Sequence, residues 1–354
     1  MDSKLKALLK TSVRTNSPDN KPIIFNLANQ TEQETVATLF AESKIETVID
    51  NYGEQSGELA LVNDPTLITK AKENASVSNN EDDPTKGVWI YFPWRETLVH
   101  SLNKDDYEKL RLSRNDNLLS KDQQNKLMNL RIGLAGLNVG NPGAISLAQE
   151  GVQKLKMADL DILSLSNLNR FRAGLPDVEL DKTTITVRQV YEVNPYADLE
   201  LYNKGIQPDN IDKFLLEPKI DLLIEEVDNL KLKIAMRERA REHKIPVLMV
   251  TGNGHNIIID IERNDLDNSG PILNGYLKPE VIERIGQVGP TTDLREKMAL
   301  ARDFMGGEIL VKELRESFDR VGIDLAGIPQ LAEATFLRGA TLAYFTRRIC
   351  VDKD

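Results

Sequence analysis

Cysteine is almost absent from this chain of 354 residues, which contains only Cys350. A disulfide within one chain needs two cysteines, and structural zinc sites usually need cysteine pairs. The sequence therefore excludes an internal disulfide framework and a Cys-x-x-Cys zinc site. Cys350 itself lies in an apolar segment, where burial favours an inert thiol over a reactive one.

Long apolar runs and excess positive charge are also missing. No stretch approaches the roughly 18 apolar residues that a membrane helix needs, and Met1 is not followed by the apolar core of a signal peptide. The 45 Lys and Arg are outnumbered by 55 Asp and Glu, which gives a net charge of -10. An acidic protein disfavours non-specific binding to nucleic acid or anionic membranes. We expect a soluble cytoplasmic protein with neither as partner, although a locally basic pocket can still hold ATP.

The length and the 40% hydrophobic content suit one large or two medium domains. Residues 1–110 are predicted to form an N-terminal α+β accessory region, and residues 111–354 a second domain with a helical C-terminal extension. The polar residues 72–86 are typical of a loop or linker. In the first region we expect strands at 22–27, 57–62 and 88–94, and a helix at 31–43 that begins with a Thr31/Glu34 capping box.

From about residue 131 short apolar runs alternate with helical patterns. The expected strands are 132–135, 155–158, 222–224, 247–250 and 256–261, and the expected helices are 143–152, 182–193, 211–216 and 230–243. Such alternation predicts an α/β fold with a doubly wound, Rossmann-like, mostly parallel sheet and helices on both faces. Residues 264–292 are predicted to be an irregular crossover, and residues 293–350 a mostly helical tail.

A glycine-bearing turn, Gly136-Leu137-Asn138-Val139-Gly140-Asn141-Pro142-Gly143, follows the first of these strands. Glycines let a backbone approach phosphate, and a helix N-terminus offers free N–H groups. Asn138 occupies a glycine slot of G-x-G-x-x-G, so a plain tight turn is the alternative. Asp159 follows Gly140 by 19 residues, near the roughly 20-residue distance at which a Rossmann acid reaches a ribose. The pair predicts a nucleotide site.

Two further motifs follow strands. Asp159-x-Asp161 is followed by Ser166-Asn167-Leu168-Asn169-Arg170, which offers an acid for ribose hydroxyls and then Asn and Arg for phosphates. Asp221-Leu222-Leu223-Ile224-Glu225-Glu226-Val227-Asp228-Asn229 places a second acid and an amide after another apolar run. Asp228 could instead cap the helix that follows.

With these motifs, residues 111 to about 261 resemble the ubiquitin-activating-enzyme-like superfamily of ThiF, MoeB and HesA type. The Arg111-Leu112-Ser113-Arg114 lead-in, the Asp159–Arg170 signature, Asp181-Lys182 and the Asp221–Asn229 motif carry the resemblance. It implies an ATP- and Mg²⁺-dependent adenylyltransferase. Such an enzyme activates a carboxylate, either the C-terminus of a ubiquitin-like protein or a small molecule, as an acyl-adenylate with release of pyrophosphate.

The resemblance also implies roles for individual residues. Asp159 would hold the ribose, within a nucleotide site that includes Gly136, Asn138, Gly140, Asp161, Asn169 and Asn229. Asn167, Arg170 and Lys182 would hold the phosphates, and Asp228 would bind Mg²⁺. Arg114 would reach into the neighbouring subunit's site of a homodimer. As alternatives, Arg114, Arg170 and Lys182 could be ordinary solvated charges.

The chain departs from the family pattern at several positions. The glycine turn is one residue shorter, Phe171 replaces a glutamine, and Lys233 replaces a common arginine. Without a cysteine in the crossover region, we expect no internal catalytic cysteine. The alternatives are a catalytically degenerate nucleotide-binding scaffold or sensor, and an NAD-binding Rossmann protein. Segments around Tyr91 and Pro329 resemble a bacterial branch whose members can be fused to a nitroreductase-like domain.

Overall fold

The computed structural model describes residues 20–71 and 83–352. The chain divides into two compact units, Met1–Ser113 and Arg114–Asp354, whereas the sequence placed a boundary between residues 110 and 111. The linker predicted at 72–86 falls largely outside the described residues. Within the described part, no helix is both long enough and apolar enough to span a membrane.

The N-terminal unit is built on a four-stranded sheet. Its strand order is β1-β3-β4-β2, and only the β2–β4 pair is parallel. The strands are β1 Ile23–Phe25, β2 Thr47–Asp50, β3 Val88–Phe92 and β4 Thr97–Ser101, and the helices are α2 Gln30–Ala41, α3 Tyr52–Asn63, α4 Leu67–Ala71 and α5 Lys104–Leu112. Its core includes Phe25, Val36 and Trp89.

Two expectations for this unit are wrong. The strand predicted at 57–62 lies inside α3, because its Glu, Leu and Ala residues favour a helix. The predicted capping box is also misplaced: Asn29 caps α2, and its side chain accepts a hydrogen bond from the Thr31 backbone N–H. The expected strands near Ile23 and Trp89 are confirmed.

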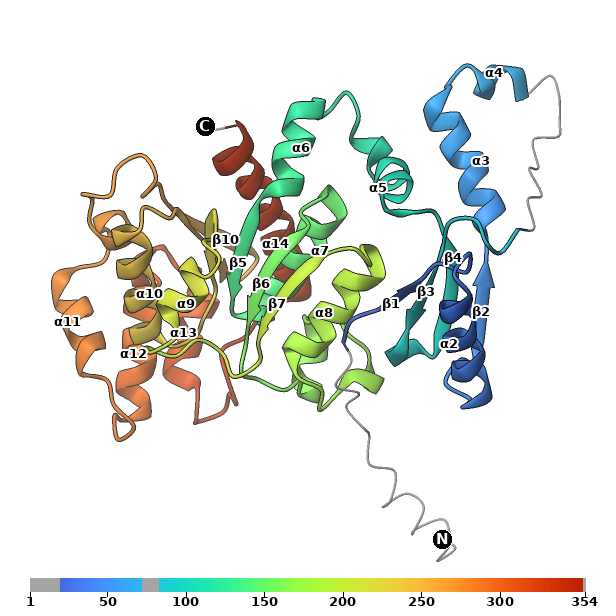
Figure 1. Cartoon of the computed structure of the whole chain (residues 1–354). Coiled ribbons are helices and arrows are strands. Elements are labelled where there is room, and N and C mark those ends of the chain that lie inside the picture. The colour runs from blue at the N-terminus through green and yellow to red at the C-terminus, as the bar shows by residue number, and fades with distance from the viewer. Residues whose placement is uncertain (1–19, 72–82, 353–354) are drawn as a thin grey trace, which may run out of the picture. The chain divides into compact units, whose positions relative to one another are not determined.

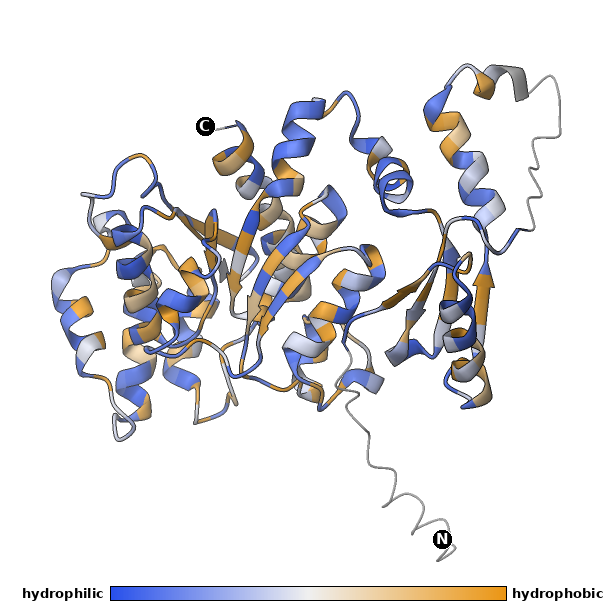
Figure 2. Cartoon of the chain, in the orientation of Figure 1, coloured by the Kyte–Doolittle hydropathy of each residue, from blue (hydrophilic) through white to orange (hydrophobic). Residues whose placement is uncertain are grey.

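The C-terminal unit is built on a six-stranded sheet of order β10-β9-β8-β5-β6-β7 (Figure 1). All neighbours are parallel except β9 and β10. The strands are β5 Arg131–Ala135, β6 Lys154–Ala158, β7 Asp198–Tyr202, β8 Leu222–Glu225, β9 Val247–Asn253 and β10 Asn256–Glu262. In Figure 2 the middle of this sheet is largely hydrophobic, as expected for strands buried on both faces. The predicted strands are confirmed, but β7 was missed.

Helices cover both faces of this sheet, as predicted. On one face α7 Leu137–Glu150 packs against α8 Lys182–Val193 and α14 Ala332–Arg347. The other face buries a core with α9 Ile211–Leu216 and α10 Leu230–Glu242. The remaining helices are α6 Lys121–Asn129, α11 Pro279–Gln287, α12 Leu294–Phe304 and α13 Lys312–Arg320.

Two boundaries differ from those predicted. Helix α7 begins at Leu137 rather than Gly143, so most of the glycine turn is helical. The predicted crossover 264–292 contains helix α11 as well as irregular chain. Helices α14 and α7 also cross closely. A Cβ added at Gly339 of α14 would lie only 2.6 Å from the Pro142 Cβ atom of α7, so glycine permits this approach.

A buried ionic cluster supports the end of β8. Arg237 is fully buried and its Nη1 atom lies 2.7 Å from Asp260 Oδ1, with Glu262 also in contact. Its Nε atom lies 3.2 Å from Glu225 Oε2, and Lys233 Nζ lies 2.8 Å from Glu225 Oε1. Lys233 also lines a cavity of this unit, but its Nζ atom is paired with Glu225, so we assign its charge to this cluster.

Candidate nucleotide site

Two adjoining cavities lie in the C-terminal unit, and both include residues that follow strands β5 and β8. The order of the sheet reverses here, since the chain continues from β5 to β6 on one side and reaches β8 on the other. Ligands of open α/β sheets bind at this switch point. The smaller cavity measures about 220 Å³ and the larger about 460 Å³. They share four wall residues, Asn138, Glu226, Val227 and Asp228.

Asp159 lines the smaller cavity at the end of β6. Its Oδ2 atom accepts a hydrogen bond of 2.6 Å from the Leu137 backbone N–H, and its Oδ1 atom accepts one of 2.8 Å from the Asp161 N–H. Burial raises the pKa of this carboxyl, and the two backbone hydrogen bonds oppose the rise. These bonds fix the carboxylate and leave other lone pairs free for hydroxyl donors.

The residues of the glycine turn differ in whether they lie at a cavity or inside helix α7. Gly136 has φ +91°, and a Cβ there would lie 2.3 Å from the Glu226 carbonyl oxygen, so only glycine fits beside the smaller cavity. Asn138 lies in the first turn of α7, and its buried Oδ1 atom has no hydrogen-bond partner within the described residues. Gly140 lies inside the helix against Leu137 and lines neither cavity.

Lys182 is buried at the start of α8, and its Nζ atom lies 2.8 Å from Asp161 Oδ2. Asp161 lines the smaller cavity, whereas Lys182 lines neither. Asn167 is also buried, and its Oδ1 atom accepts hydrogen bonds from the backbone and hydroxyl of Ser164. It shapes the turn that leads to Arg170.

Arg170 lines the larger cavity. Its Nη1 atom donates to Asn169 Oδ1 at 2.8 Å and to the Ser166 carbonyl at 3.3 Å, while its Nε atom has no partner among the described residues. Burial lowers the pKa of the guanidinium, and Asp228 opposes that effect. Asn169 in turn donates to the Gln330 carbonyl at 3.0 Å, which ties this turn to the C-terminal tail.

Asp228 lies on the wall shared by the two cavities and is exposed. No hydrogen bond to its carboxylate occurs within the described residues, so the group is free to bind a cation. Among these residues no group of three or more His, Cys, Asp and Glu could hold a metal ion. A lone carboxylate still suits Mg²⁺, which is often held by one or two carboxylates together with phosphates. Asn229 caps α10 and also lines the smaller cavity.

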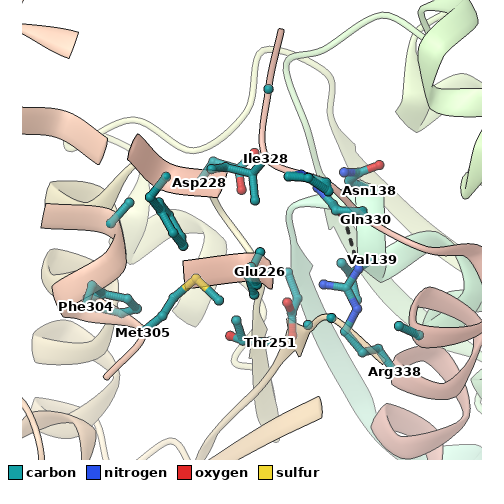
Figure 3. A pocket seen from close by; sticks show the side chains of 18 of the residues that line it. Asn138, Val139, Glu226, Asp228, Thr251, Phe304, Met305, Ile328, Gln330 and Arg338 are labelled. Atoms are coloured by element: carbon teal, nitrogen blue, oxygen red, sulfur yellow. Dashed lines mark hydrogen bonds between the residues drawn. The ribbon is translucent and has the colours of Figure 1, made fainter. Parts of the chain in front are cut away.

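Arg338 and Glu226 line the larger cavity but were missed in the sequence (Figure 3). Arg338 of α14 is only 6% exposed, and it donates to Gln330 Oε1 at 3.2 Å and to Thr335 Oγ1 at 2.9 Å. A signal existed, because residues 334, 338 and 342 share one helix face and the first and last are apolar. Burial raises the pKa of Glu226 to about 7.

Arg114 is not brought together with the other predicted residues. It is exposed in a short 3-10 turn, Ser113–Asn115, and lines neither cavity. Its expected role in a neighbouring subunit's site therefore stays a prediction.

The ThiF family matches residues 112–263. The chain is 33% identical over 305 residues to the uncharacterized protein MT1398 of Mycobacterium tuberculosis, covering 85% of this chain and 39% of that protein. It is 27% identical over 127 residues to the tRNA threonylcarbamoyladenosine dehydratase of Escherichia coli, covering 36% of this chain and 46% of that enzyme. The crystal structure of that E. coli enzyme with AMP aligns with a TM-score of 0.48 and 18% identity, over 69% of this chain and 95% of that chain. The chain thus spans less than half the length of either relative's full sequence.

Proposed function

Because residues 112–263 match the ThiF family, we propose that this chain is an ATP- and Mg²⁺-dependent adenylyltransferase. It activates a carboxylate as an acyl-adenylate and releases pyrophosphate. One observation carries the proposal. The smaller cavity, at the switch point of the sheet, and the larger cavity, which is lined by two arginines, share a wall that includes Asn138 and Asp228. A nucleoside in the smaller cavity would direct its phosphates toward that wall.

The smaller cavity is suited to the nucleoside. Asp159 is held by two backbone N–H groups and accepts ribose hydroxyls with its remaining lone pairs. Gly136 keeps the wall open, since any side chain there would collide with the Glu226 backbone. Asp161 and Asn229 also line this cavity, beside the apolar residues Ala158, Leu160, Ile206 and Leu232.

The reaction requires positive charge where the phosphates lie. An oxygen of the substrate carboxylate attacks the α-phosphorus, the bond to the β-phosphate oxygen breaks, and the electron pair leaves with pyrophosphate. Arg170 at the larger cavity stabilises the negative charge that develops on the phosphates. Lys182, held by Asp161, adds positive charge behind the nucleotide site. No general base is needed, because the attacking carboxylate is already ionised.

Asp228 is the residue that would hold Mg²⁺, and the bound ion would neutralise phosphate charge. Cys350 takes no part, since burial raises the pKa of its thiol to about 12 and leaves it protonated. The carboxylate belongs to a small molecule or to the C-terminus of a ubiquitin-like protein. In a homodimer, Arg114 would approach the partner subunit's site.

ATP–pyrophosphate exchange tests the proposal. Purified protein with ATP, Mg²⁺, labelled pyrophosphate and a panel of carboxylates should incorporate label into ATP. Arg170→Ala and Asp228→Ala should each reduce exchange by about 10²-fold or more, with unchanged circular dichroism. Arg172→Ala is the matched control, because Arg172 is a nearby exposed arginine that lines neither cavity. Exchange at the wild-type rate in Arg170→Ala or Asp228→Ala would contradict the role given to that residue.

A further inference from the structure

The larger cavity has two ends of opposite chemistry. At one end Arg338 lies beside Asn138 and Gln330, and across the cavity lie Phe304 and Met305 (Figure 3). The apolar end continues into side chains of α12 and α13, which are Met298, Ala301, Leu314 and Phe318. We call these six residues, Met298, Ala301, Phe304, Met305, Leu314 and Phe318, the apolar lobe.

Arg338 is a buried cation that has no counter-ion among residues 20–71 and 83–352. Its hydrogen bonds go to the neutral groups of Gln330 and Thr335, and within the same residues its Nε atom has no partner and its guanidinium forms no ion pair. Burial lowers its pKa, and the more distant Glu226 and Asp228 oppose that effect. A buried charge is costly unless it is paired. The site is therefore completed by an anionic group of a ligand.

The apolar lobe points to the rest of that ligand. Its residues lie beyond 263, outside the part of the chain that matches the ThiF family. Phe318 and Leu314 belong to a buried cluster against which Met298, Ala301 and Met305 pack. Such a wall gains free energy by covering apolar surface and offers few hydrogen bonds to polar groups. Methionines add adaptable surface.

We infer that the carboxylate activated at this site belongs to a small acid with an extended apolar tail. This inference rests on the proposed adenylation. Arg338 pairs with the reacting carboxylate at the end of the cavity near Asn138, and the tail occupies the apolar lobe. One carboxylate oxygen forms the bond to the α-phosphorus as pyrophosphate leaves, so nothing beyond ATP is required. A Gly-Gly terminus carries no side chain to fill the lobe and is disfavoured.

A chain-length series tests this inference. Pyrophosphate exchange is measured with butanoate, hexanoate, octanoate and glycylglycine. KM should fall by about fourfold for each added methylene until the lobe is full, and glycylglycine should be the poorest substrate. Arg338→Gln should raise KM for octanoate by about 10–150-fold. Arg338→Lys, which keeps the charge, should recover part of that loss. Ala301→Leu fills the lobe and should reverse the preference for octanoate over butanoate.

Calorimetry with octanoate, in the presence of ATP and Mg²⁺, separates this inference from the proposed function. Exchange with glycylglycine at a KM equal to or below that of octanoate would overturn the inference and leave adenylation intact. A second outcome is that octanoate binds, that Arg338→Gln abolishes this binding, and that no acid supports exchange. That outcome would support the apolar acid site and contradict adenylation. Absence of both binding and exchange would overturn both. Circular dichroism and ATP binding establish that each variant is folded.

Discussion

Alanine at Gly136 should strongly destabilise the fold and alanine at Gly140 should be nearly neutral, although both glycines belong to one turn. At Gly136 the backbone has φ +91°, and a Cβ would lie 2.3 Å from the Glu226 carbonyl oxygen and 2.9 Å from the Val227 nitrogen. Strain of that backbone and overpacking each cost about 1–3 kcal/mol, so Gly136→Ala should destabilise the C-terminal unit by about 2–6 kcal/mol. Relief requires movement of the segment that carries Asp228, so ATP binding should also be lost.

Gly140 is the matched control. It lies inside helix α7, and its nearest neighbour for an added Cβ is the Leu137 Cδ2 atom at 3.2 Å, at the end of a flexible side chain. Alanine in place of glycine in a helix stabilises the helix by about 1 kcal/mol, which offsets the cost of the tight contact with Leu137. Gly140→Ala should therefore remain within about 1 kcal/mol of wild type and bind ATP normally.

Urea denaturation followed by far-ultraviolet circular dichroism, together with ATP calorimetry, measures both effects. Tryptophan fluorescence is unsuitable, because Trp89 and Trp94 both lie in the N-terminal unit. A folded Gly140→Ala variant that lost ATP binding would contradict this prediction, because the Gly140 backbone would then contact the phosphates. Wild-type stability of Gly136→Ala would equally refute it.

Three further predictions concern ionisable groups. Burial raises the pKa of Glu226 from 4.5 to about 7, so the folded chain binds the extra proton and stability falls as pH rises through that window. Glu226→Gln should remove this dependence and be about 1–3 kcal/mol more stable than wild type at pH 8, as urea titrations at several pH values would measure. Arg237→Met leaves three buried carboxylates with too little positive charge and should lower the free energy of unfolding by at least about 3–5 kcal/mol. Urea denaturation followed by circular dichroism measures this loss, and a variant as stable as the wild type would contradict the stabilising role of Arg237. Cys350→Ser should keep pyrophosphate exchange within about twofold, and native Cys350 should react slowly with a thiol reagent, whereas loss of exchange would implicate the thiol.

The sheet of the C-terminal unit was predictable because its strands are short apolar runs between helical patterns. The β5, β6, β8 and β9 runs, the existence of strand β10 and the positions of Asp159 and Asp228 after strands all follow from that pattern. Strand β7, Asp198-Leu199-Glu200-Leu201-Tyr202, was missed because it has no continuous apolar run like the other parallel strands. Its alternation of polar and apolar residues is the pattern of a half-buried edge strand.

The rest of the site depends on tertiary contacts that no local pattern encodes. Gly136 and Gly140 look alike in the sequence, but only the first lies against the Glu226 backbone. Arg338 comes from a helix far along the chain, and its approach depends on the close α7–α14 crossing at Pro142 and Gly339. The apolar lobe likewise consists of residues that individually look like ordinary core.

Calorimetric titration with ATP and Mg²⁺ tests the central claim most directly, run beside NAD and beside Asp159→Asn. The variant keeps an oxygen that can accept one of the two backbone hydrogen bonds, so its fold should be preserved by circular dichroism. We predict micromolar ATP binding by the wild type, clear weakening in Asp159→Asn and no comparable binding of NAD. Binding of NAD without ATP, or ATP binding that Asp159→Asn leaves unchanged, would contradict the assignment of this cavity to ATP.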